Sequence, residues 1–595
     1  MCKTSFRIKQ LLCSLIFLLH SAFIACVPVI PYYSPRSQGR NGALNDAGFF
    51  LDVFSQDPKP ERIHGTIAIT PAYTKSFDNS QITQRLFGPA LQGCNDNRYL
   101  KISGSAVENP GQFDLFADYF YLPPDFESSI SFDPQVDNFL VNLQFFISLD
   151  CWMSGLYFYV YTPLVHTRWH LGICEKIINP GTFDYEEGYF AEDTVYSSAM
   201  VESFTDYANG ATITSVPNIV FQQLRSAQMS TRHLAKTRFS DILFAFGYNM
   251  FHTASYGLGF ALQGCAPTGT RPSGDFLFEP IIGNGHHWEI GAELYGYYKG
   301  LYTSDESMGI AAYFDITVSH QFSAKQYRTF DLKNNGCLSR YMLAQNMGTP
   351  VIDGLEGPTG TVPNGQFQNM FAPVANITTL AVHAHSAVQA DIVLAIVATI
   401  CDFEWEIGYN FWGASKEHLS VIETTNPFIN NTTWALKGDA HVFGYEANST
   451  TAVPLSATES KATVYSGTNI LTEGTLLPEQ NPEVDFAQTA YNGSGQLVYA
   501  QNVTNLPDGT NEILTSINPV FIKAQDINVE AARTGGYSNK IYTHFNYTWS
   551  CRQKYIPFIG FGGQFEWAPK NQAEKCNFCA LSQWGLWLKG GFSFE

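Results

Sequence analysis

Charged residues are scarce in this sequence, and basic ones are the scarcer kind. Asp, Glu, Lys and Arg make up 15% of its 595 residues, whereas a soluble globular protein carries about 25%. The formal net charge is −19, from 53 acidic and 34 basic side chains. No tract rich in Lys or Arg occurs, and this excludes a nucleic-acid partner, because phosphate binding requires a basic surface.

Long hydrophobic runs are also missing after the first residues. Beyond residue 26 no stretch of 18 apolar residues occurs, which argues against helical membrane spans. At the start, the basic residues Lys3, Arg7 and Lys9 precede an apolar run over residues 11–26, and prolines follow. This pattern predicts a signal peptide over residues 1–26 and an N-terminal extension over residues 27–64. A lipidated Cys26 is the alternative at the cleavage site.

Aromatic residues and glycine are abundant, and apolar residues alternate with polar or small ones. Phe403, Trp405 and Ile407 share one parity, and Glu404 and Glu406 share the other. Successive side chains of a β-strand point to opposite faces, so this pattern predicts one apolar face and one polar, hydrated face. The polar face is typical of the lumen of a membrane barrel, where the apolar face contacts lipid. A sandwich core is the alternative explanation for the aromatic residues.

The same alternation recurs along most of the chain. Clear segments span residues 67–77, 139–150, 242–250, 288–294, 308–319, 388–400, 403–411, 541–549 and 559–567, and weaker ones span 98–105, 113–121, 156–169, 258–262 and 436–445. We therefore expect an all-β protein in which residues 65–595 form a closed antiparallel transmembrane β-barrel with long extracellular loops. The count predicts about 14 strands, with 12–16 allowed, and barrels of this kind usually close with an even number.

The C-terminal segment carries the most specific local pattern. One face of it holds Trp584, Leu586, Leu588, Phe592 and Phe594. This face resembles the final strand of bacterial outer-membrane porin-like proteins, which the barrel-assembly machinery recognises, although here Glu595 follows the last phenylalanine. The segments 267–280 and 283–289 are similar to uncharacterised barrel proteins of intracellular, amoeba-associated bacteria. The resemblance implies an outer-membrane location, lipid as a partner and no catalytic residues, and it does not cover the long insert.

Two regions lack the strand pattern. Residues 216–238 contain good helix formers after Pro217, and they predict a short helix in a loop or in the lumen. Residues 415–538 are rich in Thr, Asn, Ser and Gly, and they predict a very long surface loop with a hairpin near residues 436–445.

The polar strand faces supply the candidate site residues. The predicted lumen-lining charges are Asp150, Asp241, Glu289, Glu293, Asp315, Asp391, Glu404, Glu406, Glu566, Arg168 and Lys589. An excess of carboxylates raises the local concentration of cations, so an open lumen would prefer them. We expect no metal or other cofactor, because His287, Glu289 and Glu293 share a strand face that supplies too few neighbouring ligands, while His286 points away. Acid–base chemistry by Glu404 and Glu406 is a minor alternative.

Together these patterns favour a porin-like barrel that passes small solutes and is not an enzyme. Three alternatives remain at this point. The first is a non-conducting surface barrel whose long loop binds a partner. The second is a barrel with an internal helix as a plug that moves hydrophobic substrates, and the third is a secreted β-rich hydrolase or lectin.

Overall fold

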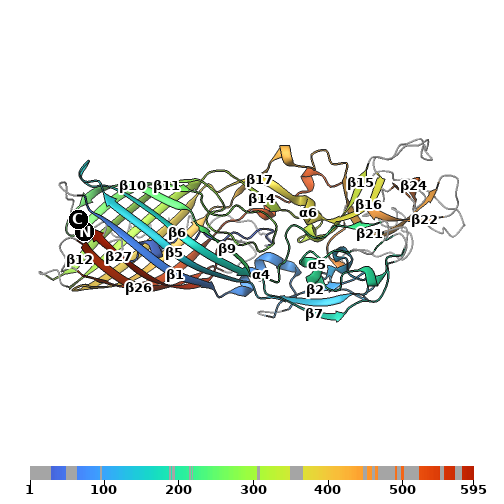
Figure 1. Cartoon of the computed structure of the whole chain (residues 1–595), viewed down its shortest axis with the longest axis horizontal. Coiled ribbons are helices and arrows are strands. Elements are labelled where there is room, and N and C mark those ends of the chain that lie inside the picture. The colour runs from blue at the N-terminus through green and yellow to red at the C-terminus, as the bar shows by residue number, and fades with distance from the viewer. Residues whose placement is uncertain are drawn as a thin grey trace, which may run out of the picture.

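The computed structural model describes most of the chain. The described residues are 29–48, 63–93, 97–185, 189–190, 194–213, 216, 219–303, 308–348, 366–446, 452–458, 462–466, 489–491, 497–501, 521–549, 555–569 and 579–594. They form an elongated molecule with a β-barrel at one end and a group of smaller sheets at the other (Figure 1). The predicted signal peptide and its cleavage site lie outside the described residues.

The barrel closes through twelve strands of the described chain, and every neighbouring pair is antiparallel. In spatial order they are β1 (Gly65–Ser76), β5 (Gln135–Ser148), β6 (Leu156–His170), β10 (Ile242–His252), β11 (Tyr256–Ala266), β12 (Glu289–Tyr302), β13 (Met308–Gln321), β18 (Gln389–Ile400), β19 (Phe403–Ala414), β25 (Gly536–Thr548), β26 (Tyr555–Trp567) and β27 (Gln583–Phe594). β27 pairs with β1 from Phe594 opposite Gly65 to Gln583 opposite Ser76, which joins the two ends of the sheet. β9 (Leu234–Phe239) extends β10, because both pair with β6.

The two ends of the barrel differ in the length of their connections. At one end the turns are short: two residues, Cys401 and Asp402, join β18 to β19, and residues 253–255 join β10 to β11. At the other end residues 77–134, 171–241, 322–388 and 415–535 connect barrel strands and carry the smaller sheets. Outer-membrane barrels have short periplasmic turns and long extracellular loops, so we call the second end the outer end.

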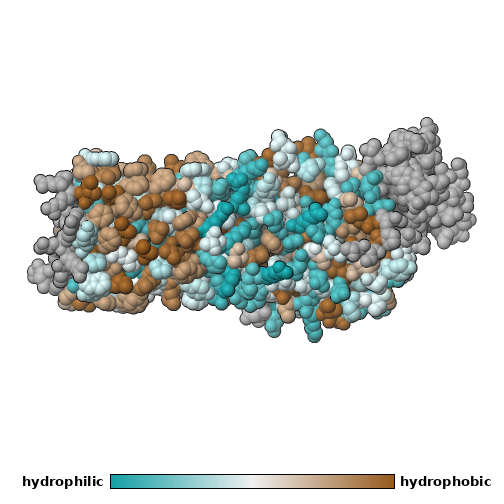
Figure 2. Space-filling view, in the orientation of Figure 1, coloured by the Kyte–Doolittle hydropathy of each residue, from teal (hydrophilic) through white to brown (hydrophobic). Residues whose placement is uncertain are grey.

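A belt of exposed apolar side chains surrounds the barrel. Leu262 is 64% exposed and Trp405 is 45% exposed, whereas Glu406, of opposite parity, is 4% exposed. Figure 2 shows this belt over the barrel, whereas the outer half has a more polar surface with smaller apolar patches. An apolar surface this extensive favours contact with lipid and argues against the secreted soluble alternative. The chain is therefore built as an integral barrel of the outer-membrane type.

The outer half contains three sheets packed around their own hydrophobic core. The first contains β3 (Leu115–Phe116), β2 (Tyr99–Ser103), β4 (Glu127–Phe132) and β7 (Ile173–Asn179), and the second contains β14 (Ala324–Thr329), β17 (Thr379–His385) and β20 (His418–Val421). The third contains β23 (Thr489–Tyr491), β24 (Leu497–Gln501), β21 (Trp434–Glu446), β15 (Leu343–Gly348), β16 (Gln366–Pro373), β8 (Val220–Phe221) and β22 (Ala452–Thr458). Short helices join them: α4 (Asn79–Phe87), α5 (Phe204–Ala208) and α6 (Val374–Thr378). No helix among the described residues is long and apolar enough to cross a membrane.

The closed antiparallel barrel is confirmed, and its twelve strands lie at the lower end of the predicted range of 12–16, below the central value of about 14. The segments 98–105, 113–121 and 436–445, which we counted as weak barrel candidates, lie in the outer sheets. Sheets that bury one face alternate in the same way as barrel strands, so alternation alone did not separate the two.

The helix predicted over residues 216–238 is wrong. Its described part is extended or turned, and it includes β8 and β9. Ala227 has a positive φ of 53°, which no helix accommodates. Leu224, Ala227 and Met229 are each buried in the outer core, so tertiary packing overrides the local helix propensity here.

Candidate functional site: the plugged lumen

A segment near the N-terminus enters the barrel from its outer end. Val29, Ile30 and Tyr33 pack in the outer core, where the Tyr33 ring lies 5.8 Å from that of Trp169. The chain then passes into the lumen, where α2 (Gly42–Asp46) contacts β18 and β19. Asn41 begins this short helix by accepting a hydrogen bond from the backbone N–H of Leu44. We call residues 36–48 the plug.

Two arginines hold the plug to acidic residues of the wall. Arg36 pairs with Asp391 on β18, and its Nη1 lies 3.5 Å from Glu566 Oε1 on β26. Arg40 pairs with Glu289 on β12 and donates from Nη1 to Gln263 Oε1 at 3.2 Å. Because these side chains are almost fully buried, each charge depends on its partner for stabilisation.

Further hydrogen bonds join the plug to other parts of the wall. Ser37 Oγ donates to Asp241 at 2.7 Å, and Asn41 Nδ2 donates to Gln564 on β26 at 3.2 Å. Asn45 accepts at its side-chain oxygen from Asn142 and at its carbonyl from Gln144, both on β5 and both at 2.9 Å. Polar groups of the plug are thus satisfied by the wall from opposite sides of the lumen.

Lysines of the wall complete the contacts. Lys589 on β27 donates to the carbonyls of Leu44 and Asn45 at 2.8 and 3.0 Å. A cation beside the last carbonyls of a helix is favourable, because these carbonyls lack partners within the helix. Lys540 on β25 donates to Asn41 Oδ1 at 2.6 Å.

The plug also fits the wall sterically. A Cβ at Gly48 would lie 2.3 Å from His544 Nε2, and the φ of Gly48 is +62°. The backbone N–H of Gly48 donates to Glu406 Oε2 at 3.0 Å. Only glycine allows this backbone both its conformation and its approach to the wall.

Aromatic side chains narrow the lumen beside the plug. Buried tyrosines on β6, β12, β13 and β25, with Trp587 on β27, cluster with the apolar plug residues Ala43, Leu44 and Ala47. Tyr157 lies across Gly247 on the neighbouring strand β10, where an added Cβ would come within 1.9 Å of its ring. Small residues on one strand thus let a large ring from the next strand lie against the wall.

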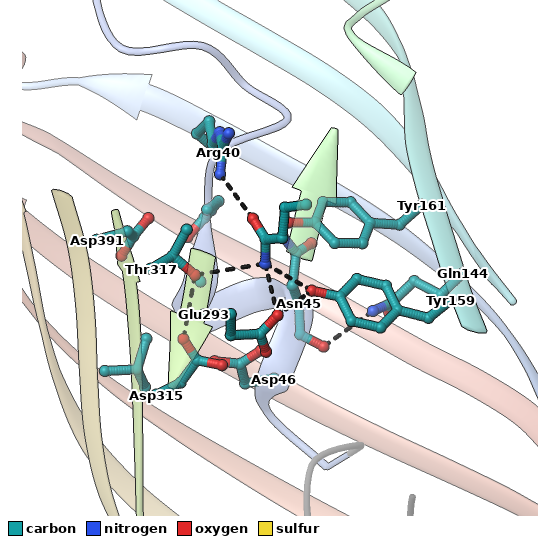
Figure 3. A pocket seen from close by; sticks show the side chains of 14 residues that line it. Arg40, Asn45, Asp46, Gln144, Tyr159, Tyr161, Glu293, Asp315, Thr317 and Asp391 are labelled. Atoms are coloured by element: carbon teal, nitrogen blue, oxygen red, sulfur yellow. Dashed lines mark hydrogen bonds between the residues drawn. The ribbon is translucent and has the colours of Figure 1, made fainter. Parts of the chain in front are cut away.

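An acidic cavity of about 50 Å³ remains between the plug and the wall. The carboxyl groups of Asp46, Glu293 and Asp315 point toward one another at its edge (Figure 3). Tyr159 donates its hydroxyl to Glu293, and Gln263 Nε2 donates to the same carboxylate at 2.5 Å. The cavity is large enough for one or two water molecules.

The structure places most of the predicted lumen charges around the plug. The residues buried on the inner side of the barrel are Asp241, Glu289, Glu293, Asp315, Asp391, Glu406, Glu566 and Lys589. Glu404 has the inward parity of Glu406 and accepts a hydrogen bond from Asn546 at 3.2 Å. Asp150 lies in the turn after β5, at the barrel end, where it accepts from the backbone N–H of Gly155 at 2.6 Å.

Arg168 corrects the prediction, because it lies on the outer surface of the barrel. Its side chain is 51% exposed, and its Nη2 lies 3.0 Å from Asp137 Oδ2. On this part of β6 the inward parity belongs to Val165, Thr167 and Trp169, all of which are fully buried. Arg168 therefore has the opposite parity and points away from the lumen.

Sequence reasoning missed the plug arginines and Lys540. Arg36 and Arg40 occur in a stretch rich in Ser, Gly and Asn without alternation, so nothing local places them inside a barrel. Lys540 lies on β25, one residue before the segment recognised by its alternation, and its inward parity could have identified it. Among the described residues no group of three or more His, Cys, Asp or Glu is placed to hold a metal ion.

The C-terminal face has the orientation that the sequence predicts. Leu586 and Leu588 are 59% and 49% exposed on β27, and Trp587 between them is buried. Trp584, Phe592 and Phe594 share the outward parity. Recognition of this strand by the assembly machinery stays a prediction.

Comparisons with known proteins give only distant likenesses. No family model matches the chain, and no curated protein matches it. An outer membrane channel from Pseudomonas putida F1 aligns over 89% of this chain and 96% of its own, with 8% identity and a TM-score of 0.28. A FadL homologue from Pseudomonas aeruginosa (6% identity, 95% and 99% covered, TM-score 0.24) and the Pseudomonas putida toluene transporter TodX (7%, 96% and 99%, 0.26) align similarly.

These scores are too low to assign a family or a substrate. The similarity to barrels of amoeba-associated bacteria also stays a prediction. The barrel itself, its apolar belt and its plugged lumen are the features from which function has to be argued.

Proposed function

We propose that the protein is an outer-membrane channel for small hydrophilic solutes, kept closed by residues 36–48. The observation that carries this proposal is the chemistry of the plug contacts. Arg36, Arg40 and Asn45 bind the wall through ion pairs and hydrogen bonds, all of which water can replace when the plug leaves. The plug is also a continuous segment of chain, so it can leave while every strand pair of the barrel stays intact.

The lumen composition favours cations as the solutes. The charged groups described inside the barrel are the carboxylates Asp46, Asp241, Glu289, Glu293, Asp315, Asp391, Glu404, Glu406 and Glu566, and the cations Arg36, Arg40, Lys540 and Lys589. Carboxylates outnumber cations by about two to one. A pore lined in this way concentrates cations and repels anions.

A reversible lock tests whether the plug closes the conducting path. A Cβ at Gly42 would lie 2.7 Å from Val393 Cγ2 on β18, so cysteines at both positions are close enough to form a disulfide. We expect the oxidised Gly42→Cys, Val393→Cys protein to be silent in planar bilayers, and we expect reductant to restore the openings of the wild type. The two single-cysteine variants are the controls.

Two outcomes would contradict the channel. One is an oxidised variant that conducts as the wild type does. The other is a protein that stays silent after Arg36→Ala and Arg40→Ala together weaken the plug. A reversal potential that shows anion preference in a salt gradient would contradict the cation preference alone.

The outer half favours a second candidate, a non-conducting surface barrel that binds a partner. The outer half consists of three sheets with their own hydrophobic core, so it is a folded unit and not only a set of loops. Folded structure at the extracellular end is what a binding role would require. If the variant with both Arg36→Ala and Arg40→Ala shows no conductance in planar bilayers, that result would favour this candidate. Neither candidate includes a catalytic step.

A further inference from the structure

The segment just before the plug is buried in the outer half, although it belongs to none of the outer sheets. Residues 29–33 form neither a helix nor a strand, and all five side chains are buried. The backbone N–H of Ile30 donates to the carbonyl of Arg85 in α4 at 2.9 Å. We call residues 29–33 the latch.

Tyr32 of the latch packs against an arginine of the second outer sheet. The guanidinium carbon of Arg328 on β14 lies 4.1 Å from the centre of the Tyr32 ring. In its own plane the same guanidinium donates to both carboxylate oxygens of Glu417, at 2.8 and 2.9 Å, and to the side-chain oxygen of Gln326. The edge of the guanidinium is thus occupied, and its face stabilises the Tyr32 ring through a buried cation–π contact.

Tyr33 of the latch contacts aromatic rings from two other parts of the chain. Its ring centre lies 5.8 Å from that of Trp169 on β6 and 5.7 Å from that of Phe278 in the connection between β11 and β12. The latch therefore contacts α4, the second sheet and the rim of the barrel at once. Its release requires all three contacts to be broken.

A stiff link joins the latch to the plug. Pro31 and Pro35 enclose the two tyrosines, and Arg36 of the plug follows Pro35 directly. A proline fixes its own φ and restricts the residue before it, so a displacement of the latch is passed on to Arg36.

The plug is held differently at its two ends. Toward the far end of the barrel it is joined covalently to β1, whose first residue, Gly65, pairs with the C-terminal strand there. In the part of the chain that the structure describes, no strand precedes residue 29, so noncovalent contacts hold the outer end of the plug. The contacts of the latch therefore decide whether this end can move.

We propose that the latch regulates the channel: the plug leaves the lumen only when residues 29–33 release from the outer half. The inference rests on the proposed channel function. A plug held by its lumen contacts alone would open without any change in the outer half. A latched plug instead couples the lumen to the outer sheets, so the folded outer half controls opening.

Single-channel recordings of the full-length protein and its latch variants test this coupling. Tyr32→Ala removes the ring that Arg328 covers, and we expect the ratio of open to closed channels to rise at least about tenfold, as the loss of a buried cation–π contact predicts. Tyr32→Phe keeps the ring and should stay at the wild-type ratio. Tyr207→Ala removes an equally buried tyrosine whose ring contacts are Phe120, Tyr121 and Phe204, and it should also stay there.

The disulfide lock between the plug and the wall shows whether these openings pass through the plug. Adding oxidised Gly42→Cys, Val393→Cys to Tyr32→Ala should abolish the openings, and reductant should restore them. Openings that survive the oxidised lock would refute the latch. A Tyr207→Ala variant that opens as often as Tyr32→Ala would also refute it, because the effect would then be a general loosening of the outer half.

The variant with both Arg36→Ala and Arg40→Ala separates failure of the latch from failure of the channel. If this variant conducts while Tyr32→Ala opens no more often than the wild type, the latch is wrong and the channel function stands. If every variant is silent, this one included, the channel function is wrong and the latch falls with it.

Discussion

Replacing Arg40 should release the plug more than any other single change. Its guanidinium donates from Nε to Glu289 at 3.1 Å and from Nη1 to Gln263 at 3.2 Å, and both ends of the ion pair are buried. Removing one partner of a buried pair costs about 3–5 kcal/mol, because the remaining charge is left without compensation. In Arg40→Ala that cost is borne by the closed state, since Glu289 regains access to water when the plug leaves.

The size of this effect sets the expected change in conductance. A free-energy difference of about 1.4 kcal/mol changes an equilibrium constant tenfold. Destabilising the closed state by about 3–5 kcal/mol therefore raises the ratio of open to closed channels by roughly two to three and a half powers of ten. Single-channel recordings of the wild type and of Arg40→Ala measure this ratio directly. Removing the stranded carboxylate in Arg40→Ala, Glu289→Ala should bring the ratio back toward that of the wild type.

A matched control separates opening from general destabilisation. Arg340 and Asp331 form a buried pair at 3.3 Å in the outer half, with no part in the lumen. Arg340→Ala therefore removes a comparable pair and should leave the open fraction unchanged. The reasoning fails if Arg40→Ala opens no more often than the wild type, or if Arg340→Ala opens as often as Arg40→Ala.

Three further predictions concern stability and assembly. Gly247→Val would place a Cβ within 1.9 Å of the Tyr157 ring, and we expect a loss of at least about 1–3 kcal/mol in urea unfolding followed by gel mobility, with Tyr157→Ala restoring part of it. Burial raises the pKa of Asp118 to about 7, against about 3.9 in an unfolded chain. The folded outer half therefore binds the additional proton and loses stability as the pH rises from about 4 to 7. Asp118→Asn should remove this dependence over the same pH range, and an unchanged slope would refute it. Phe594→Ala should lower the fraction of chains assembled in the outer membrane, measured by heat-dependent mobility of membrane extracts, whereas the adjacent Ser593→Ala should not.

The wall of the barrel could be predicted because its physics is local. Each strand contacts lipid with one face and the polar lumen with the other. The position of Trp405 and Glu406 in the alternation therefore predicts which of them faces lipid and which faces the lumen. Each of the twelve barrel strands overlaps a segment recognised by alternation or by the C-terminal pattern, although strands such as β11 and β12 extend beyond it. Parity also failed locally: Arg168 was predicted to line the lumen, but on this part of β6 the inward parity belongs to its neighbours Thr167 and Trp169.

The plug could not be predicted because its position depends on the closed barrel. Arg36 and Arg40 acquire their partners only when β12, β18 and β26 come together around them. Those strands are separated from the plug by hundreds of residues, and no spacing in the sequence encodes the contacts. The sheets of the outer half could not be predicted for a similar reason. Segments such as residues 98–103 form sheets only with strands that lie elsewhere in the connections between barrel strands.

Opening and selectivity should be coupled, because the plug carries part of the lumen charge. When residues 36–48 leave, the lumen loses Arg36, Arg40 and Asp46, and Lys540 and Lys589 become the remaining described cations of the wall. They then face eight wall carboxylates, so the ratio of acidic to basic groups rises from about two to about four. The fully open channel should therefore prefer cations more strongly than any partly open state in which Arg40 still occupies the lumen.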